Sequence, residues 1–155
     1  MTWSNSTPAA NRARLEELAA DEPAPGLVAY RDERAVGWVS VGPREGYDRL
    51  ASAKLLAPVD DVPVWSIVCF VVSRSVRGSG VGRALLRAAI DHAAAHGAPM
   101  LEAYPVATER GQVAPASAYQ GAQSMFEREG FEVVEVRRWN ATSPPRPIMR
   151  RALSR

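Results

Sequence analysis

The chain has 155 residues, of which 46% are hydrophobic and 23% charged, with 19 basic and 17 acidic side chains. This composition suits one globular domain over residues 1–155 and excludes a chain that is disordered throughout. Its lone cysteine, Cys69, excludes an internal disulfide or a cysteine-based zinc site. The sequence contains no run of 18 apolar residues and no signal-peptide pattern, so we expect no membrane association and a cytoplasmic location.

The basic residues are almost all arginine, and Lys54 is the only lysine. Arginine suits bidentate contacts with phosphates or carboxylates. The basic residues are interleaved with acidic ones, however, so we expect no nucleic-acid partner. His92 and His96 have the i,i+4 spacing of helical metal sites, but no glutamate follows His92 as in a zinc hydrolase motif, and we expect no metal.

The first half of the chain predicts one helix followed by a hairpin. Residues 1–10 are small and polar, and we expect them to be loose. Leu15 and Leu18 share a face of the helix that follows. The helix and the two strands are predicted over residues 11–20, 27–30 and 35–41. Charged residues 31–34 fit the hairpin tip, and residues 44–54 fit either a short helix or a loop.

The middle of the chain carries its clearest pattern. Residues 64–72 form the most apolar run, rich in β-branched and aromatic side chains, which predicts a central strand buried on both faces. Residues 80–96 have one apolar stripe at helical spacing, and Gly97 follows as a stop signal. The later strand, loop, helix and two strands are predicted over residues 100–106, 107–115, 117–129, 131–136 and 148–153. This order favours an α/β or α+β fold with a mixed sheet.

The most informative motif lies between that strand and that helix, in the sequence VRGSGVGR over residues 76–83. A glycine-rich turn that enters a helix exposes unpaired backbone N–H groups at the positive end of the helix dipole, which suits phosphate or pyrophosphate. The P-loop pattern fails because no Lys-Ser/Thr pair ends the turn, and the dinucleotide pattern fails because its last glycine is Arg83.

The spacing of Arg77, Gly80 and Gly82 resembles the pyrophosphate-binding motif of the GCN5-related N-acetyltransferase (GNAT) superfamily. The resemblance covers residues 27–136 and includes the later sequence MFEREGFEVV. It implies a mostly antiparallel central sheet flanked by helices, here with a shortened N-terminal part. It also implies acetyl-CoA as the co-substrate.

By the same resemblance, the backbone of the central strand lies along the pantetheine of acetyl-CoA, and one of its N–H groups polarises the thioester carbonyl. The strand residues concerned are Phe70, Val71 and Val72. The cofactor-binding turn consists of Arg77, Gly78, Ser79, Gly80, Val81, Gly82 and Arg83, and Arg74 and Arg87 can add positive charge near the phosphates.

The proton donor departs from the family pattern. The family often has a tyrosine, which protonates the departing thiolate, where this chain has Phe126. It often has an asparagine seven residues earlier, where this chain has Tyr119. Tyr104 or Tyr119 can replace the missing acid, or each can be a packing aromatic. A thiol of pKa near 8.5 is also a tolerable leaving group without a donor.

The proton acceptor is equally open. Glu102, on the strand after the turn, is the best candidate for the general base, with Glu45, Asp60 and Asp61 as loop alternatives. Arg44 can bind a substrate carboxylate or lie on the surface. For Glu102 a salt-bridged role is the alternative.

The resemblance implies an N-acetyltransferase in which a primary amine attacks acetyl-CoA directly. The alternative is a non-catalytic acyl-CoA-binding or regulatory module, which Phe126 and the short N-terminal part favour. The acceptor is a small-molecule or peptide amine that the sequence does not identify. A homodimer fits the resemblance.

Overall fold

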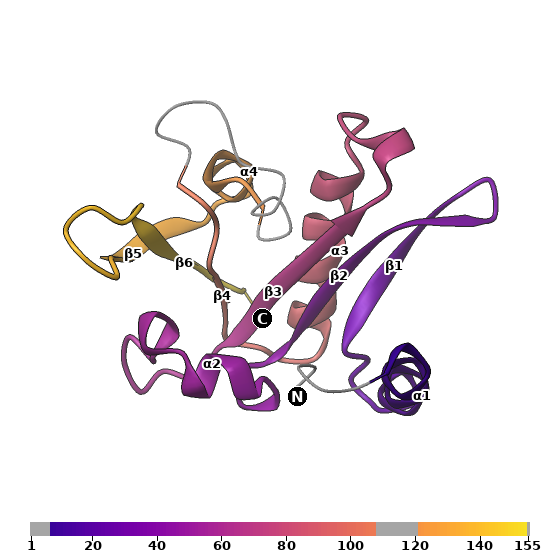
Figure 1. The fold of residues 1–155 in the computed structure, drawn as a ribbon, viewed down its shortest axis with the longest axis horizontal. Helices are drawn as coiled ribbons and strands as arrows, with labels where there is room; N and C mark the ends of the chain where they lie inside the picture. Colours follow the sequence, from indigo (N-terminus) through magenta and orange to yellow (C-terminus); the bar gives the residue numbers. More distant parts are fainter. Residues whose placement is uncertain (1–6, 108–120, 155) are drawn as a thin grey trace.

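The protein is built on a six-stranded mixed sheet with the order β1-β2-β3-β4-β6-β5 (Figure 1). The computed structural model describes residues 7–107 and 121–154. The strands are β1 (Gly26–Arg31), β2 (Arg34–Pro43), β3 (Trp65–Val72), β4 (Met100–Ala103), β5 (Glu132–Arg137) and β6 (Arg146–Ala152). Among the strands of this sheet only β3 and β4 pair in parallel, so the expected mixed, mostly antiparallel sheet is confirmed.

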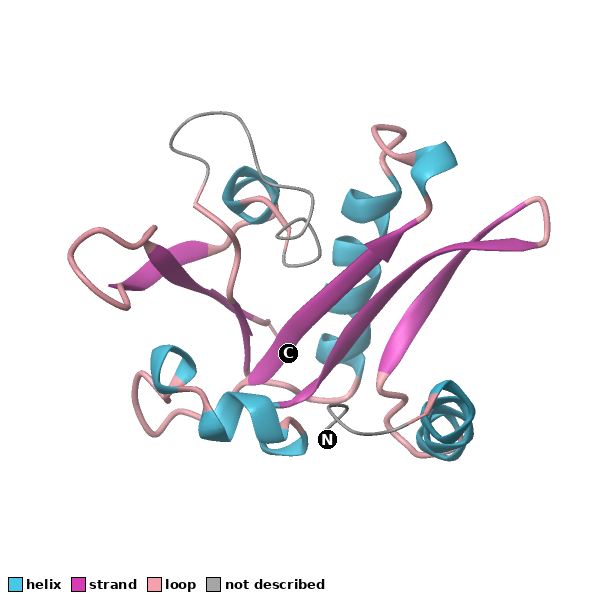
Figure 2. Ribbon diagram, in the orientation of Figure 1, coloured by secondary structure: helices cyan, strands magenta, loops and turns pink. Residues whose placement is uncertain are grey.

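Helices lie on both faces of this sheet (Figure 2). The α-helices are α1 (Pro8–Ala19), α2 (Asp48–Ser52), α3 (Val81–Ala95) and α4 (Gln123–Arg128). The described residues also form the short 3₁₀ helices η1 (Arg44–Gly46), η2 (Lys54–Leu56) and η3 (Arg74–Val76). The structure therefore places both a helix and further helical turns in the segment that the sequence left open between helix and loop.

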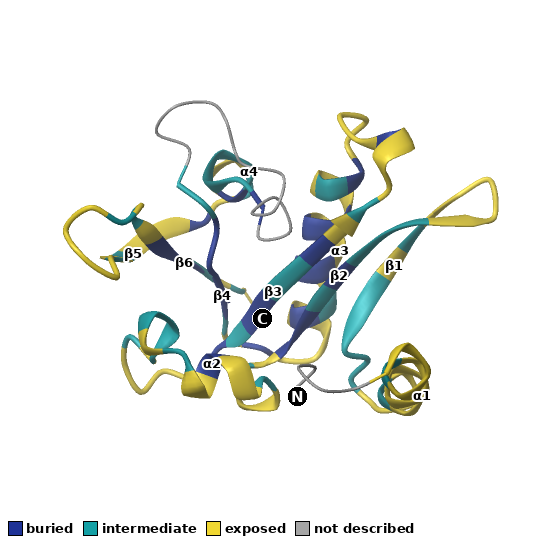
Figure 3. Ribbon diagram, viewed as in Figure 1, coloured by how far each residue is buried: buried dark blue, intermediate teal, exposed yellow. Residues whose placement is uncertain are grey.

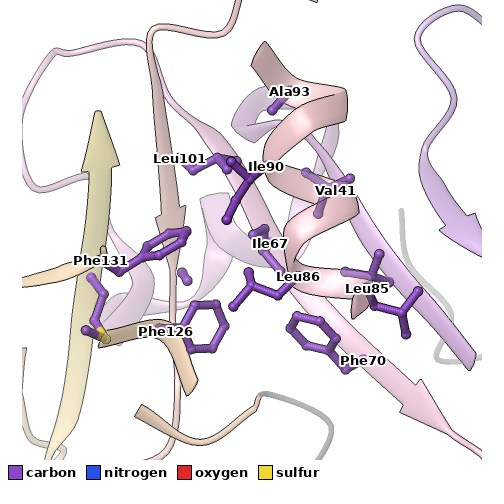
Figure 4. Close-up of a cluster of buried hydrophobic side chains, with 14 of the residues drawn as sticks. Val41, Ile67, Phe70, Leu85, Leu86, Ile90, Ala93, Leu101, Phe126 and Phe131 are labelled. Atoms are coloured by element: carbon purple, nitrogen blue, oxygen red, sulfur yellow. The ribbon is translucent and has the colours of Figure 1, made fainter. Parts of the chain in front are cut away.

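The main hydrophobic core lies between the sheet and α3 and α4 (Figure 4). Its helix contribution comes from one stripe of α3, made by Val81, Leu85, Leu86, Ala89, Ile90 and Ala93. The stripe recurs every three or four residues, as the sequence predicted. Phe126 of α4 is fully buried in the same cluster, so the two helices share one core.

A second, smaller cluster lies on the other face of the sheet, under α2 and η2. It is formed by buried Leu50, Tyr104 and Ile148, against which Leu56 and Val68 pack. The segment between β2 and β3 therefore serves as the cover for this face of β3, β4 and β6.

The face of β1, β2 and β3 away from α3 is less covered than the sequence predicted (Figure 3). Val28, Trp38 and Val71 pair across these strands in one row. Val28 is 43% exposed and Val71 is 55% exposed. The expectation that the central strand is buried on both faces is thus wrong at Val71, because α2 and η2 cover only the half of the sheet nearer β4.

Two helix boundaries also differ from the sequence prediction. Helix α1 begins at Pro8, so residues 8–10 are helical rather than loose, and the Thr7 side chain accepts a hydrogen bond from Ala10 N at 3.2 Å. Threonine before proline is a helix-start signal that the prediction missed. Ala122, within the predicted helix, instead forms a β-bridge with Val106, and α4 follows from Gln123; the predicted helix residues 117–120 lie outside the described residues.

The hairpin between β1 and β2 matches the prediction at its tip. Asp32 and Glu33 both have positive φ, +48° and +64°. Two such residues in a two-residue turn match the twist of the flanking strands.

None of the helices in the described ranges has both the length and the hydrophobicity that crossing a membrane requires.

We expect Gly26→Ala to destabilise the fold by about 1–3 kcal/mol through overpacking. A Cβ at Gly26 would collide with the backbone oxygen of Val39 and the indole of Trp38, and the strand pairing holds that oxygen in place. Gly46→Ala is the control, because a Cβ there meets nothing within 4 Å. Urea unfolding measures both variants, and equal stabilities would contradict this account of the β1–β2 packing.

Candidate active site

The site begins where β3 and β4 stop pairing. Their parallel register ends at Ile67 and Ala103, while β3 continues to Val72. The chain after β4 turns instead toward the segment before α4. Val106 N donates to Gly121 O at 3.1 Å, and Val106 O accepts from Gln123 N at 3.3 Å. Beyond this divergence, one edge of β3 has no neighbouring strand among the described residues.

A β-bulge lies at the same point. Ser40 pairs with Cys69 and Val41 pairs with Ile67, so Val68 is the extra residue. A bulge bends its strand and changes the direction of its backbone groups, which is common beside active sites. The edge of β3 after Val68 therefore has backbone donors and acceptors that no strand among the described residues pairs with.

The glycine turn lies at the far end of β3, at the start of α3. Gly78 and Gly80 have φ of +77° and +89°, a region that favours glycine, and a Cβ at either would meet nothing within 4 Å. The first hydrogen bond of the helix runs from Ala84 N to Gly80 O. The amides of Val81, Gly82 and Arg83 therefore precede the helical ladder and remain available, which fits a pyrophosphate.

Side chains of the turn help to hold its shape. Ser79 Oγ donates to Val76 O at 2.5 Å, and Arg31 of β1 donates to Ser79 Oγ at 3.3 Å. Arg77 Nε donates back to Val72 O at 3.2 Å. Arg77 thus connects the turn to the end of β3, and Arg31, at the end of β1, connects the turn to the β1–β2 hairpin.

Arg83 and Arg87 share a partner that the sequence analysis missed. Glu129, just after α4, accepts from Arg83 Nε at 2.7 Å and from Arg87 Nε at 3.1 Å. The hydrogen bond from Arg83 is the main reason that the pKa of Glu129 lies below its ordinary value. Both arginines are half exposed, and the ion pairs tie the outer side of α3 to the end of α4.

Of the strand residues expected along the cofactor, Phe70 has its side chain in the hydrophobic core. Phe70 is 5% exposed, and its ring packs edge-on against Phe126 at 6.0 Å between centroids. Phe126 in turn packs against Phe131 at 5.2 Å. Phe126, which stands in the position of the family's tyrosine, is therefore a core residue. Phe70 has only its backbone to offer a ligand.

Glu102 lies at the centre of a buried polar network beside the divergence. The side chain is 1% exposed, and its two oxygens bind Arg44 Nη1 at 3.1 Å and Arg150 Nε at 2.7 Å. Tyr104 OH donates to Oε1 of the same carboxylate at 2.7 Å. Burial of a carboxylate is costly unless it is paired in this way. These contacts favour the salt-bridged alternative for Glu102, and its action as a base stays a prediction.

Tyr104 is equally engaged. Its hydroxyl accepts from Arg44 Nη1 at 2.7 Å and lies 2.9 Å from Ser66 Oγ. Burial is the main cause that raises its pKa above the ordinary tyrosine value. A structural role suits these contacts, and the catalytic role stays a prediction. Tyr119 lies outside the described residues.

Arg44 is part of this network, and Asp60, in the exposed loop after η2, is linked to it through Arg150. Arg44 Nη2 donates to Leu50 O at 3.1 Å and to Leu56 O, which fixes α2 and η2. Asp60 binds Arg150 at 2.7 Å, and this hydrogen bond lowers the pKa of Asp60. Arg44 is thus not the surface residue of the second alternative; these contacts give it a structural role, and its binding of a substrate carboxylate stays a prediction. The other loop carboxylates, Glu45 and Asp61, are exposed.

Comparison with known proteins decides the family. The model of the Acetyltransferase (GNAT) family matches residues 1–131 of the sequence. The chain belongs to this family. Its members transfer acetyl groups from acetyl-CoA to amines, so the protein is an acetyl-CoA-dependent acyltransferase. No curated protein matches the sequence itself.

Solved structures of GNAT proteins have the same fold. An acetyltransferase from Streptococcus pneumoniae superposes with a TM-score of 0.62 at 14% identity, over 97% of this chain and 79% of that chain. The ribosomal-protein-alanine N-acetyltransferase from Brucella melitensis gives 0.61 at 21%, over 92% and 77%. A chain of the NatC complex, bound to Gag peptide and CoA, gives 0.61 at 13%, over 97% and 84%.

The remaining candidates of this GNAT protein have packing roles. Cys69 is a free, partly buried thiol, and burial raises its pKa. His92 and His96 contact Trp65, each with 5.9 Å between ring centroids, and His92 Nε2 lies 3.2 Å from Ala24 O. No group of three metal-ligating side chains occurs within residues 7–107 and 121–154.

We expect Gly80→Asp to weaken CoA binding more than tenfold, which needs only about 1.4 kcal/mol of repulsion and strain. The matched control is Gly97→Asp at the other end of α3. Gly97 has a similar φ of +75° and nothing within 4 Å, so the backbone strain is alike but the phosphates are remote. Calorimetric titration with CoA measures both. Equal affinities of the two variants would remove the turn from the cofactor site.

We also expect Tyr104→Phe to cost about 2 kcal/mol of stability, because it leaves buried Ser66 Oγ without its hydroxyl partner. Tyr47→Phe is the control and costs less than about 1 kcal/mol. Ser40 Oγ, the partner of Tyr47, still donates to Pro25 O at 3.3 Å. Urea unfolding compares them, and a larger loss in the Tyr47 variant would contradict the network.

Proposed function

We propose that this protein acetylates the α-amino group of a peptide by direct attack of the amine on acetyl-CoA. The divergence of β3 from β4 at Ile67 and Ala103 carries the proposal. Acetyl-CoA would lie along the unpaired edge of β3, with its pyrophosphate on the amides of Val81–Arg83 and its thioester near Val68.

Backbone groups would supply the electrostatic part of the reaction. Attack on the thioester carbonyl moves negative charge onto its oxygen, and a fixed N–H of β3 beyond the bulge can stabilise that charge. The amine nitrogen forms the new amide bond, the carbon–sulfur bond breaks, and the proton of the amine is lost to solvent. Thiolate leaves without a tyrosine donor because its conjugate thiol has a pKa near 8.5.

The ionisable side chains of the two diverging strands favour a weakly basic acceptor. Residues 65–72 and 100–107 contain Cys69, Glu102 and Tyr104 as their ionisable groups. Glu102 and Tyr104 are held in the buried network, and the raised pKa of Cys69 keeps its thiol protonated at neutral pH. An acceptor that arrives already neutral needs no protein base.

Amine basicity then separates the acceptor classes. An α-amino group of pKa about 7.8 is neutral in about one molecule in seven at pH 7, whereas a lysine side chain of pKa about 10.4 is neutral in about one in 2,500. At pH 7 the neutral, reactive fraction of the α-amine is therefore about 300-fold larger than that of the lysine side chain. Structural neighbours described as ribosomal-protein-alanine N-acetyltransferase and as the peptide-bound NatC complex support this class.

The test is the pH dependence of kcat/KM for amines of different basicity. We expect kcat/KM to rise tenfold per pH unit and to level off at the pKa of each amine, so that the plateau moves with the substrate. Two matched peptides are compared. The first has a free N-terminus as its amine. The second has the same sequence with an acetylated N-terminus and one added lysine, whose side chain is its amine. Thiol release from acetyl-CoA measures both reactions.

A plateau at one pH for every amine would instead assign a protein base, and preference for the lysine peptide would overturn the α-amine proposal. Tight CoA binding without turnover of any amine would support the alternative, a non-catalytic acyl-CoA-binding module, which buried Phe126 favours.

We place the reaction in the cytoplasm because the single free cysteine suits a reducing compartment. The homodimer stays a prediction.

A further inference from the structure

A pocket of about 320 Å³ lies between η2 and the end of β5, and the catalytic scheme does not use it. We call it the Trp139 pocket, and its walls are Lys54, Leu55, Arg137, Arg138 and Trp139. Three of these five side chains are cationic and one is a large aromatic. Trp139 is 70% exposed, although exposed tryptophan is common mainly at binding surfaces.

Arg137 builds the pocket rather than serving a ligand. Its Nη1 donates to Leu55 O at 3.2 Å and to Ala57 O at 2.6 Å, which joins β5 to the η2 segment. Its Nη2 binds Glu135 Oε2 at 2.6 Å. The two walls are thus fixed to each other, and the charge of Arg137 is balanced by Glu135.

Lys54 and Arg138 carry the positive charge of the pocket that Glu135 does not balance. Lys54 is exposed, and its ammonium has no hydrogen bond or ion pair with any residue of the described chain. Arg138 donates through Nη1 to Ser143 O at 2.8 Å and keeps its other guanidinium donors. Asp60, in the segment after η2, is bound to Arg150. The pocket therefore has two unbalanced positive charges beside an aromatic surface, which suits a carboxylate on a flexible chain.

The pocket lies on the acceptor side of the proposed reaction. Leu55 is followed by Leu56, which packs in the same cluster as Tyr104 and as Val68 at the bulge. That cluster is on the face of the sheet away from α3. The glycine turn, which would hold the phosphates, lies at the far end of β3, and β4 runs between it and the loop after β5 (Figure 1).

We propose that the Trp139 pocket binds an acidic side chain of the acceptor peptide, a few residues beyond the amine that is acetylated. Leu55 of the pocket wall is next to Leu56, which packs in the same cluster as Val68, so the pocket is close to the bulge on a scale of a few extended residues of about 3.3–3.6 Å each. This inference rests on the proposed peptide acceptor. It adds a sequence preference, acidic over neutral, that the reaction alone does not require.

Binding tests the pocket separately from catalysis. The probe is a fluorescent peptide, already acetylated at its N-terminus, with Glu at positions 3 to 5, and its partner has Gln at these positions. Fluorescence anisotropy with CoA present measures both. We expect the Glu peptide to bind at least tenfold more tightly, with the advantage falling as salt rises. Equal binding of the two peptides would overturn the proposal, whether or not any amine is acetylated.

Variants then locate the contact. The double variant Lys54→Gln with Arg138→Gln should lose the advantage of the Glu peptide and leave binding of the Gln peptide unchanged. Arg34→Gln at the β1–β2 hairpin, which removes one exposed charge elsewhere, should keep it. If the double variant retains the preference, the pocket is not the acidic subsite. If single-stranded RNA displaces the Glu peptide at lower concentration than unlabelled peptide does, the pocket belongs to nucleic acid and the proposal fails.

Turnover gives the last measurement. For free N-terminal peptides, the double variant should raise KM for the Glu peptide about tenfold with little change in kcat, because the contact is remote from the reacting atoms. A fall in kcat for both peptides alike would point to a structural defect. That result would contradict a binding role for Lys54 and Arg138.

Discussion

The end of β3–β4 pairing at Ile67 and Ala103 is the constraint on which the rest of the site depends. Up to that point the two strands share backbone hydrogen bonds, and beyond it the backbone of β3 needs other partners. The bulge at Val68 lies at the same level, so the strand changes course where its neighbour leaves. A cofactor with amide groups along its length can complete such an edge as a further strand would.

The Glu102 network stabilises the paired part of β3 and β4, which precedes the divergence. Ser66 of β3, Glu102 of β4 and Arg150 of β6 pair across the sheet in one row, and Arg44 extends the row to α2 and η2. Breaking a buried ion pair by removing one partner is far more costly than losing an exposed one. The network thus lies directly beside the point where the divergence begins.

The sequence predicted the elements that depend on local signals and missed what depends on tertiary contacts. The apolar stripe of α3, the hairpin tip at Asp32 and Glu33 and the glycine turn all follow from spacing and turn chemistry. Glu102 looked like a candidate base because its strand was expected beside the cofactor. Its partners Arg44 and Arg150 are 58 and 48 residues away along the chain, and no local pattern reveals such pairs.

Phe126 shows how packing and chemistry compete at one position. Fully buried between Phe70 and Phe131, it joins α4 to the sheet core, where a tyrosine hydroxyl would need a hydrogen-bond partner. The protein gains an apolar contact there and gives up a proton donor. Since a thiolate leaves readily near neutral pH, the larger demand falls on the amine, which must lose its proton. The weakly basic acceptor that we propose would meet this demand, because such an amine is already partly neutral near pH 7.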